Sequence, residues 1–163
     1  MRRNRKGAGT GPLLEQHMIR RPLALIVLAA WSGAALAQDS TISFGLGFDP
    51  ATSAALTARG EMVIISAWYF GDPARPEVKV DEIGQVYLGG EELTIYPLDQ
   101  QITLGTNLAN AKLGDVIAPM VNINIFTARQ THEDNLIDCD FIEGPVAEIA
   151  AQDLILTCTL LNP

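Results

Sequence analysis

The chain has 163 residues, 48% of them hydrophobic and 18% charged, and a formal net charge of -8. Of its 11 Lys and Arg, 6 precede residue 38, as does one of its 19 Asp and Glu, which leaves 5 basic and 18 acidic residues beyond that point. Such an acidic surface repels nucleic acid and anionic lipid, so we expect no nucleic-acid partner; a basic protein partner or a divalent cation would suit it. The aliphatic content is too high for a disordered chain.

The N-terminal region is expected to be a leader that is not part of the fold. Two arginines precede the apolar run 22–31, and small residues follow it up to Ala37, which is the order of a secretory signal peptide. We predict a signal peptide over 18–37, with cleavage after Ala37, and a non-native or disordered extension over 1–17. Residues 38–163 then form one exported domain, periplasmic or secreted. We expect no stable membrane insertion after cleavage, because a bilayer span needs ~20 apolar residues.

The first part of the exported chain is predicted to contain two strands. Residues 41–50 are an expected edge strand, and residues 51–60 a loop or a weak helix. Residues 61–70 alternate between two sets of side chains that are both largely apolar. This pattern predicts a central strand that is covered, at least in part, on both sides.

The middle of the chain is predicted to form a hairpin and one further strand. Segments 84–90 and 91–97 flank the pair Gly89 and Gly90, which tolerates the positive φ angles of a tight turn. Residues 101–105 form the next short strand.

The clearest alternation in the chain is at 121–129, where isoleucines and asparagines predict one dry and one wet strand face. Residues 135–142 are predicted to be another strand, with Ile137, Cys139 and Phe141 on its buried face. The two aspartates between them, Asp138 and Asp140, are then expected on a hydrated face.

The C-terminal part is predicted to hold one short helix, near residues 146–152, and a last strand over 154–161. The whole pattern gives about eight short strands, with turn signals every dozen residues or so. It predicts an all-β fold, an antiparallel β-sandwich that is immunoglobulin-like in the broad sense.

Cys139 and Cys158 are the two cysteines of the chain. An even count in an exported protein predicts a disulfide, and both residues lie on expected buried strand faces. Two cysteines alone do not complete a four-ligand zinc site, and no Cys-x-x-Cys redox pair is present. The sequence does not decide whether the bond joins neighbouring strands or spans two sheets.

His132, Glu133 and Asp134 are the candidate metal ligands, and Asp138 follows close by. A histidine with several carboxylates can hold calcium or zinc if a tight turn brings the side chains together. The spacing lacks the glycine and the terminal glutamate of an EF-hand loop. The same residue types also suit a solvated connection between two strands, so both alternatives stay open.

Trp68, Tyr69 and Phe70 form the aromatic cluster of the predicted central strand. Aromatic side chains beside a turn can line a carbohydrate or peptide site, and they also pack in cores and at rims. We therefore expect an acidic binding or structural module, without a cofactor, rather than an enzyme. The alternative is a small metal-assisted hydrolase centred on His132 and the neighbouring carboxylates.

Overall fold

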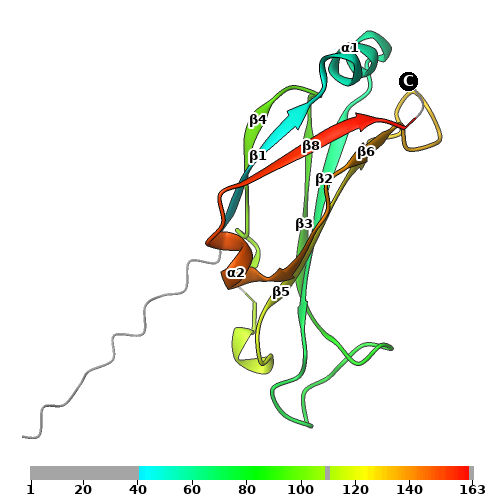
Figure 1. Cartoon of the computed structure of the whole chain (residues 1–163). Coiled ribbons are helices and arrows are strands. Elements are labelled where there is room, and N and C mark those ends of the chain that lie inside the picture. The colour runs from blue at the N-terminus through cyan, green and yellow to red at the C-terminus, as the bar shows by residue number, and fades with distance from the viewer. Residues whose placement is uncertain (1–40, 109–110, 162–163) are drawn as a thin grey trace, which may run out of the picture. The chain divides into compact units, whose positions relative to one another are not determined.

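The computed structural model describes residues 41–108 and 111–161, which belong to one compact unit (Figure 1). The predicted signal peptide and N-terminal extension lie outside these residues. The described chain is mostly β, as expected, with eight strands and two short α-helices. No helix in this part of the chain is long and apolar enough to cross a membrane.

The strands form two four-stranded sheets. In spatial order, the first sheet consists of β4 (Gln100–Leu104), β1 (Ile42–Phe48), β8 (Leu154–Leu160) and β6 (Ile137–Cys139). The second sheet consists of β3 (Val86–Ile95), β2 (Val63–Gly71), β5 (Met120–Thr127) and β7 (Ile142–Pro145). The helices are α1 (Pro50–Arg59), α2 (Val146–Ala150) and the short 3-10 helix η2 (Leu113–Asp115).

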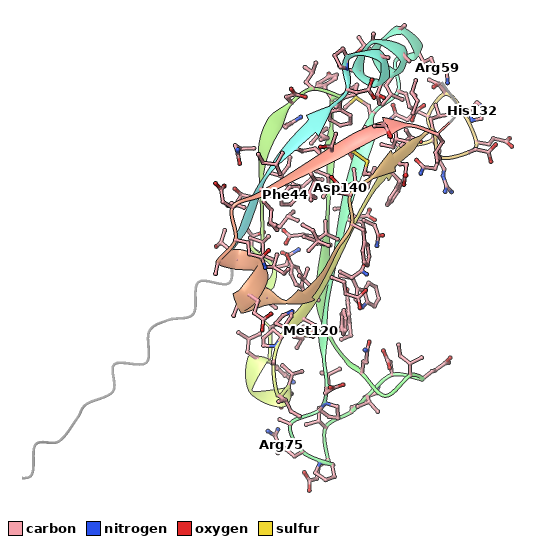
Figure 2. All side chains as sticks on the ribbon, in the orientation of Figure 1. Phe44, Arg59, Arg75, Met120, His132 and Asp140 are labelled. Atoms are coloured by element: carbon pink, nitrogen blue, oxygen red, sulfur yellow. A yellow bond between two sulfur atoms is a disulfide. The ribbon has the colours of Figure 1, made fainter. Side chains whose placement is uncertain are left out.

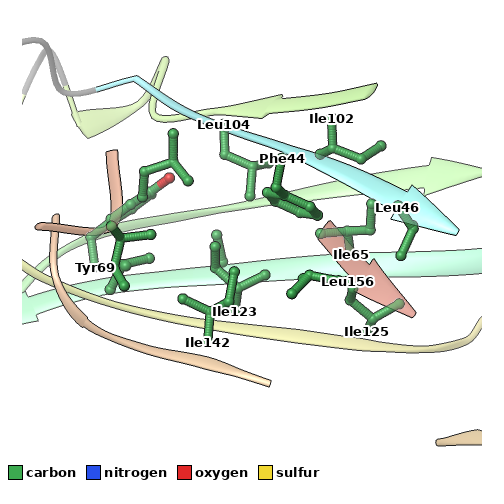
Figure 3. Close-up of a cluster of buried hydrophobic side chains, with 14 of the residues drawn as sticks. Phe44, Leu46, Ile65, Tyr69, Ile102, Leu104, Ile123, Ile125, Ile142 and Leu156 are labelled. Carbon is green, nitrogen blue, oxygen red and sulfur yellow. The ribbon is translucent and has the colours of Figure 1, made fainter. Parts of the chain in front are cut away.

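One hydrophobic cluster draws its side chains from both sheets (Figure 3). Strand alternation decides which residues enter it, since every second residue of β1, β2 and β5 is buried. The first sheet contributes, among others, Phe44, Leu104 and Leu156, and the second Ile65 and Ile123. The prediction that residues 61–70 form a central strand is confirmed, because β2 lies between β3 and β5.

Strand β1 is not the edge strand that the sequence suggested. It lies between β4 and β8, and its pairing with β8 is parallel, with Phe44 beside Leu154. Parallel neighbours need a long connection between them. The rest of the domain supplies that connection, because β1 and β8 are its first and last strands. The sheets are therefore rich in antiparallel pairs without being purely antiparallel.

The predicted hairpin at Gly89 and Gly90 is wrong, because both residues lie within the single strand β3. The glycines accompany a bulge: Tyr69 is opposite Gly89, whereas the next residue, Phe70, is opposite Tyr87. Gly89 has a φ of 131°, a conformation that side chains rarely adopt. The glycine pair therefore permits a β-bulge and not a hairpin turn. The connection between β2 and β3 is the longer loop 72–85.

The predicted strand 135–142 is two strands in different sheets, β6 and β7. Asp140 makes the last contacts with the first sheet: its N–H donates to the Thr157 carbonyl (3.1 Å), and its Oδ2 accepts from the Thr157 N–H (2.8 Å). Two residues later, Ile142 pairs with Ile123 of the second sheet. Phe141, expected to be buried, lies at the crossing and is 60% exposed.

Residues 51–60, expected to be a loop or a weak helix, form most of helix α1. Asp49 caps its N-terminus, accepting hydrogen bonds from the N–H groups of Ala51 (2.9 Å) and Thr52 (3.2 Å), and Pro50 follows in the first turn. Gly60 ends the helix in the left-handed conformation, at a φ of 65°. These two caps stabilise a helix whose sequence is only weakly amphipathic. The predicted helix near 146–152 is present as α2.

Candidate functional site

The polar loop after β5 is held in place by a buried carboxylate. Glu61 is 1% exposed, and its two oxygens accept hydrogen bonds from the N–H groups of Gln130 (3.0 Å) and Thr131 (2.8 Å) and from the Thr131 hydroxyl. Burial alone would raise the pKa of Glu61, but the hydrogen bonds of Thr131 and Gln130 outweigh it and hold the pKa below its ordinary value. Arg129, with a φ of 55°, turns the chain into this loop.

The candidate metal ligands His132, Glu133 and Asp134 follow directly, and all three side chains are exposed. His132 Nδ1 accepts a hydrogen bond from the backbone N–H of Asp134 (3.2 Å), which is the geometry of a local turn. Asp138 is also exposed, on β6 opposite Thr159. Among the described residues, no three His, Cys, Asp or Glu side chains come together in a way that could hold a metal ion.

His132 and Asp134 do line a cavity of about 340 Å³, together with Arg59. Figure 2 shows Arg59 and His132 near the same end of the sheets. The rest of the lining is largely aliphatic, from Leu136 and the end of β8. The lining holds one acid and no serine or cysteine. It therefore supplies neither a carboxylate pair nor a nucleophile beside a base.

The disulfide between Cys139 and Cys158 is confirmed. The two residues are directly opposite in the antiparallel pair of β6 and β8, with their Cα atoms 4.1 Å apart. The bond therefore joins neighbouring strands of the first sheet and does not connect the two sheets. It fastens the short strand β6 to β8.

The aromatic cluster of β2 is divided between two faces. Trp68 is 52% exposed on the outer face of the second sheet, and Phe70 is partly exposed on that same face. Tyr69 points the other way and is fully buried, so it cannot line a surface site. The partner of Trp68 is instead Tyr87 of β3, 53% exposed, with ring centroids 4.4 Å apart and planes inclined by 37°.

We call Trp68, Phe70, Tyr87 and Met120 the aromatic face. Register places these residues together, because Phe70 of β2 lies between Tyr87 of β3 and Met120 of β5. Trp68 is one residue earlier than Tyr69 and occupies the same side as Phe70. The result is a largely apolar patch, exposed in part, on the outer face of the second sheet.

Polar side chains continue from the aromatic face across the sheet. Asn122 is opposite Trp68 and donates a hydrogen bond to Oε2 of Glu143 on β7 (3.0 Å). Asn124 in turn donates to the Asn122 side-chain oxygen. Hydrogen-bonding groups of both kinds, donors and acceptors, therefore lie at one side of the indole ring.

The sequence indicated some of this site and missed the rest. The alternation at 121–129 placed Asn122 and Asn124 on a wet face, and Trp68 was a candidate. Tyr87 carried no signal, because the bulge in β3 sets its register and a bulge is not visible in the alternation. Glu143 was missed because the predicted strand 135–142 ended before it, whereas β7 comprises Ile142–Pro145.

Comparison of the chain with protein-family models, with curated proteins and with solved structures found no match. Its function is therefore argued from its own residues.

Proposed function

We propose that the two sheets are the layers of a β-sandwich, immunoglobulin-like in the broad sense, and that the domain is an exported binding module. The single hydrophobic cluster shared by both sheets supports a two-layer arrangement. So does the path of the chain: β2 and β3 are the one pair of consecutive strands in the same sheet, and every other connection changes sheet.

The ligand of this module, we propose, is a saccharide that binds on the aromatic face. The observation that carries the proposal is the Trp68–Tyr87 pair, two rings in contact that each leave about half of their surface to solvent. The C–H groups of a pyranose ring form an apolar surface that can lie against such rings. Aromatic side chains supply much contact area at a small entropic cost, and they favour binding sites for that reason.

The neighbouring polar groups favour a saccharide over a purely apolar ligand. Asn122 and Glu143 are already linked by a hydrogen bond, so their remaining donors and acceptors are held in a fixed orientation. Sugar hydroxyls both donate and accept, and they match this mixture. A peptide that adds a strand would bind at a sheet edge, whereas this patch centres on β2, which has a neighbour on both sides.

Fluorescence of Trp68 tests the proposal directly. The chain has tryptophans at positions 31 and 68. A protein that begins at Gln38 therefore has Trp68 as its single indole. We expect saccharides from a panel of neutral and acidic oligomers to change its emission, and calorimetry to confirm binding. The variant W68A should lose binding by calorimetry at least tenfold, since one stacked aromatic supplies a large share of the contact energy.

The matched control is Y96A, which removes an exposed aromatic away from the aromatic face and should leave affinity unchanged. If no saccharide binds the unaltered protein at millimolar concentration, or if W68A binds as tightly as the parent, the proposed function is wrong. Circular dichroism of each variant establishes that it is folded.

A further inference from the structure

A cavity of about 530 Å³ lies where the loop 72–85 meets the region of η2, and Tyr87 of the aromatic face is among its lining residues. Its lining includes Val78 and the largely buried Val86 and Leu88. Figure 2 labels Arg75 and Met120 toward this end of the sheets, and Arg59 and His132 toward the other.

Basic side chains collect at this cavity. The described residues contain five Lys and Arg, and three of them line it: Arg75, Lys79 and Lys112. Two acids, Glu77 and Asp115, line it as well. In a domain that is strongly acidic, three cations against two acids give a local excess of one positive charge, which favours an anion here.

One of the three cations is committed to structure, and two are not. Arg75 Nη2 contacts Oδ1 of Asp115 at 2.7 Å, and its Nη1 donates to the Gly114 carbonyl at 3.1 Å. This is the one ion pair within 4.0 Å among the described residues. Lys79 and Lys112 therefore keep their ammonium groups available, Asp115 is paired with Arg75, and Glu77 is the lining acid without an ion pair.

The walls of the cavity are joined by backbone hydrogen bonds. The Ala74 N–H donates to the Asp115 carbonyl (2.8 Å), and the Ile117 N–H donates to the Asp72 carbonyl (3.0 Å). Pro73 and Val116 form a β-bridge between these two bonds. The loop is thus fixed against the η2 region before any ligand arrives, so a ligand does not have to order it.

From this arrangement we infer that the cavity binds the carboxylate of a uronate-type saccharide, which reaches it from the aromatic face around β3, an edge strand of the second sheet. The inference rests on the proposed function and specifies that the saccharide ligand is negatively charged. Lys79 and Lys112 are the carboxylate partners, and the aliphatic side chain of Val78 lies beside them in the lining. Tyr87 connects the two parts, since the residue is among those lining the cavity and its ring contacts Trp68 on the outer face.

The test uses a pair of ligands that differ only in charge. Short oligogalacturonate and oligomannuronate are compared with their methyl esters, in which each carboxylate is neutral and the sugar backbone is kept. We expect the acids to bind about tenfold more tightly than the esters at low salt, because charge-assisted hydrogen bonds are the strong ones. Raising the salt from 20 to 200 mM should reduce that difference.

The variants separate the charge from the aromatic contact. K79Q/K112Q should bind acids and esters equally, and the control R59Q/R129Q, which removes the same charge elsewhere, should keep the preference for acids. If the esters bind the parent as tightly as the acids, or if K79Q/K112Q keeps the preference, the inference falls. In that case the proposed function stands, provided that W68A loses both kinds of ligand. If neither acids nor esters bind, both the proposed function and this inference are wrong.

Discussion

The phenolic hydroxyl of the buried Tyr69 donates a hydrogen bond to Oε1 of Glu91, at an O–O distance of 2.5 Å. The same carboxylate accepts from the Gly105 N–H (2.5 Å) and from the Thr106 hydroxyl (3.1 Å). It therefore links β2 and β3 of the second sheet to the chain that leaves β4 of the first. A tyrosine expected at a binding surface instead ties three segments of the fold together.

Removing that hydroxyl should destabilise the domain. We expect Y69F to lower the free energy of unfolding by about 1–2 kcal/mol, since it removes a hydrogen bond to a charged group and leaves the ring in place. Urea denaturation at neutral pH measures the change. Y96F, which alters an exposed tyrosine, is the control and should lie within about 0.5 kcal/mol of the parent. Equal effects of the two substitutions would contradict the role given to Tyr69.

Alkaline pH should weaken the domain through the same residue. Burial, together with the hydrogen bond and negative charge of Glu91, raises the pKa of Tyr69 above its ordinary value of 10.0. The folded state therefore keeps a proton that the unfolded state loses. Its contribution is complete below pH 10.0 and is lost as the pH rises toward the folded pKa. Unfolding free energies of the parent should fall over this range more steeply than those of Y69F.

Acid should act through Glu61, whose folded pKa is held below the ordinary value of 4.5. Its stabilising contribution is therefore present above pH 4.5 and is lost as the pH falls through the folded pKa. The variant E61Q should be less stable than the parent by about 1–2 kcal/mol at pH 7, with the gap narrowing in acid. The exposed E92Q serves as the control, and a gap that persists unchanged at pH 3 would refute this account.

Reduction of the disulfide should lower stability by ~3 kcal/mol, as expected for a crosslink that closes a loop of this length in the unfolded chain. The bond joins residues separated by 19 positions. Urea unfolding with and without a phosphine reductant measures the effect. The double variant C139S/C158S should be insensitive to reductant, and mass spectrometry of the parent should find no alkylatable thiol. A parent whose unfolding midpoint ignores the reductant would contradict the prediction.

The end of helix α1 offers a test of backbone conformation alone. A Cβ added at Gly60 would meet no atom within 4 Å, yet the residue has a φ of 65°. G60A should therefore cost about 1 kcal/mol from left-handed strain and not from a clash. Gly114 also has open space around its Cα but no positive φ, so G114A is the matched control and should be nearly neutral. Thermal melts of G60A and G114A measure the two changes in stability.

Alternation predicted the elements that stay in one sheet. Residues 61–70 and 121–129 show a regular period and became β2 and β5. The dry face expected for β5 is buried, whereas one of the two apolar faces of β2 is buried and the other is open at Trp68. The same pattern failed at 135–142, because Ile137, Cys139 and Phe141 alternate regularly even though the chain changes sheets at Phe141. A period of two reports which side a residue faces within a strand, and contains no information on where a strand leaves its sheet.

The candidate site was less predictable than the fold, since its parts come from distant segments. Trp68 and Tyr87 meet only because a bulge shifts β3 against β2. Lys79 and Lys112 share a cavity because hydrogen bonds hold two loops together. Neither the Trp68–Tyr87 contact nor the shared cavity can be inferred from the local amino-acid composition. The signals for α1 were present in Asp49 and Gly60, and the weak amphipathicity between them concealed the helix.

The parallel pairing of β1 with β8 has a consequence for the order of folding. Strand β1 obtains its second neighbour only when residues 154–158 arrive, at the far end of the domain. Contacts of such long sequence separation form slowly, because the entropy cost of closing the loop comes before the contacts can offset it. Until then Phe44 and Leu46 lack part of their cover. In a chain synthesised from its N-terminus, the first sheet would therefore stay incomplete, with exposed apolar side chains, until β8 is made. Because Cys158 lies on β8, its disulfide with Cys139 would also form only at that late stage.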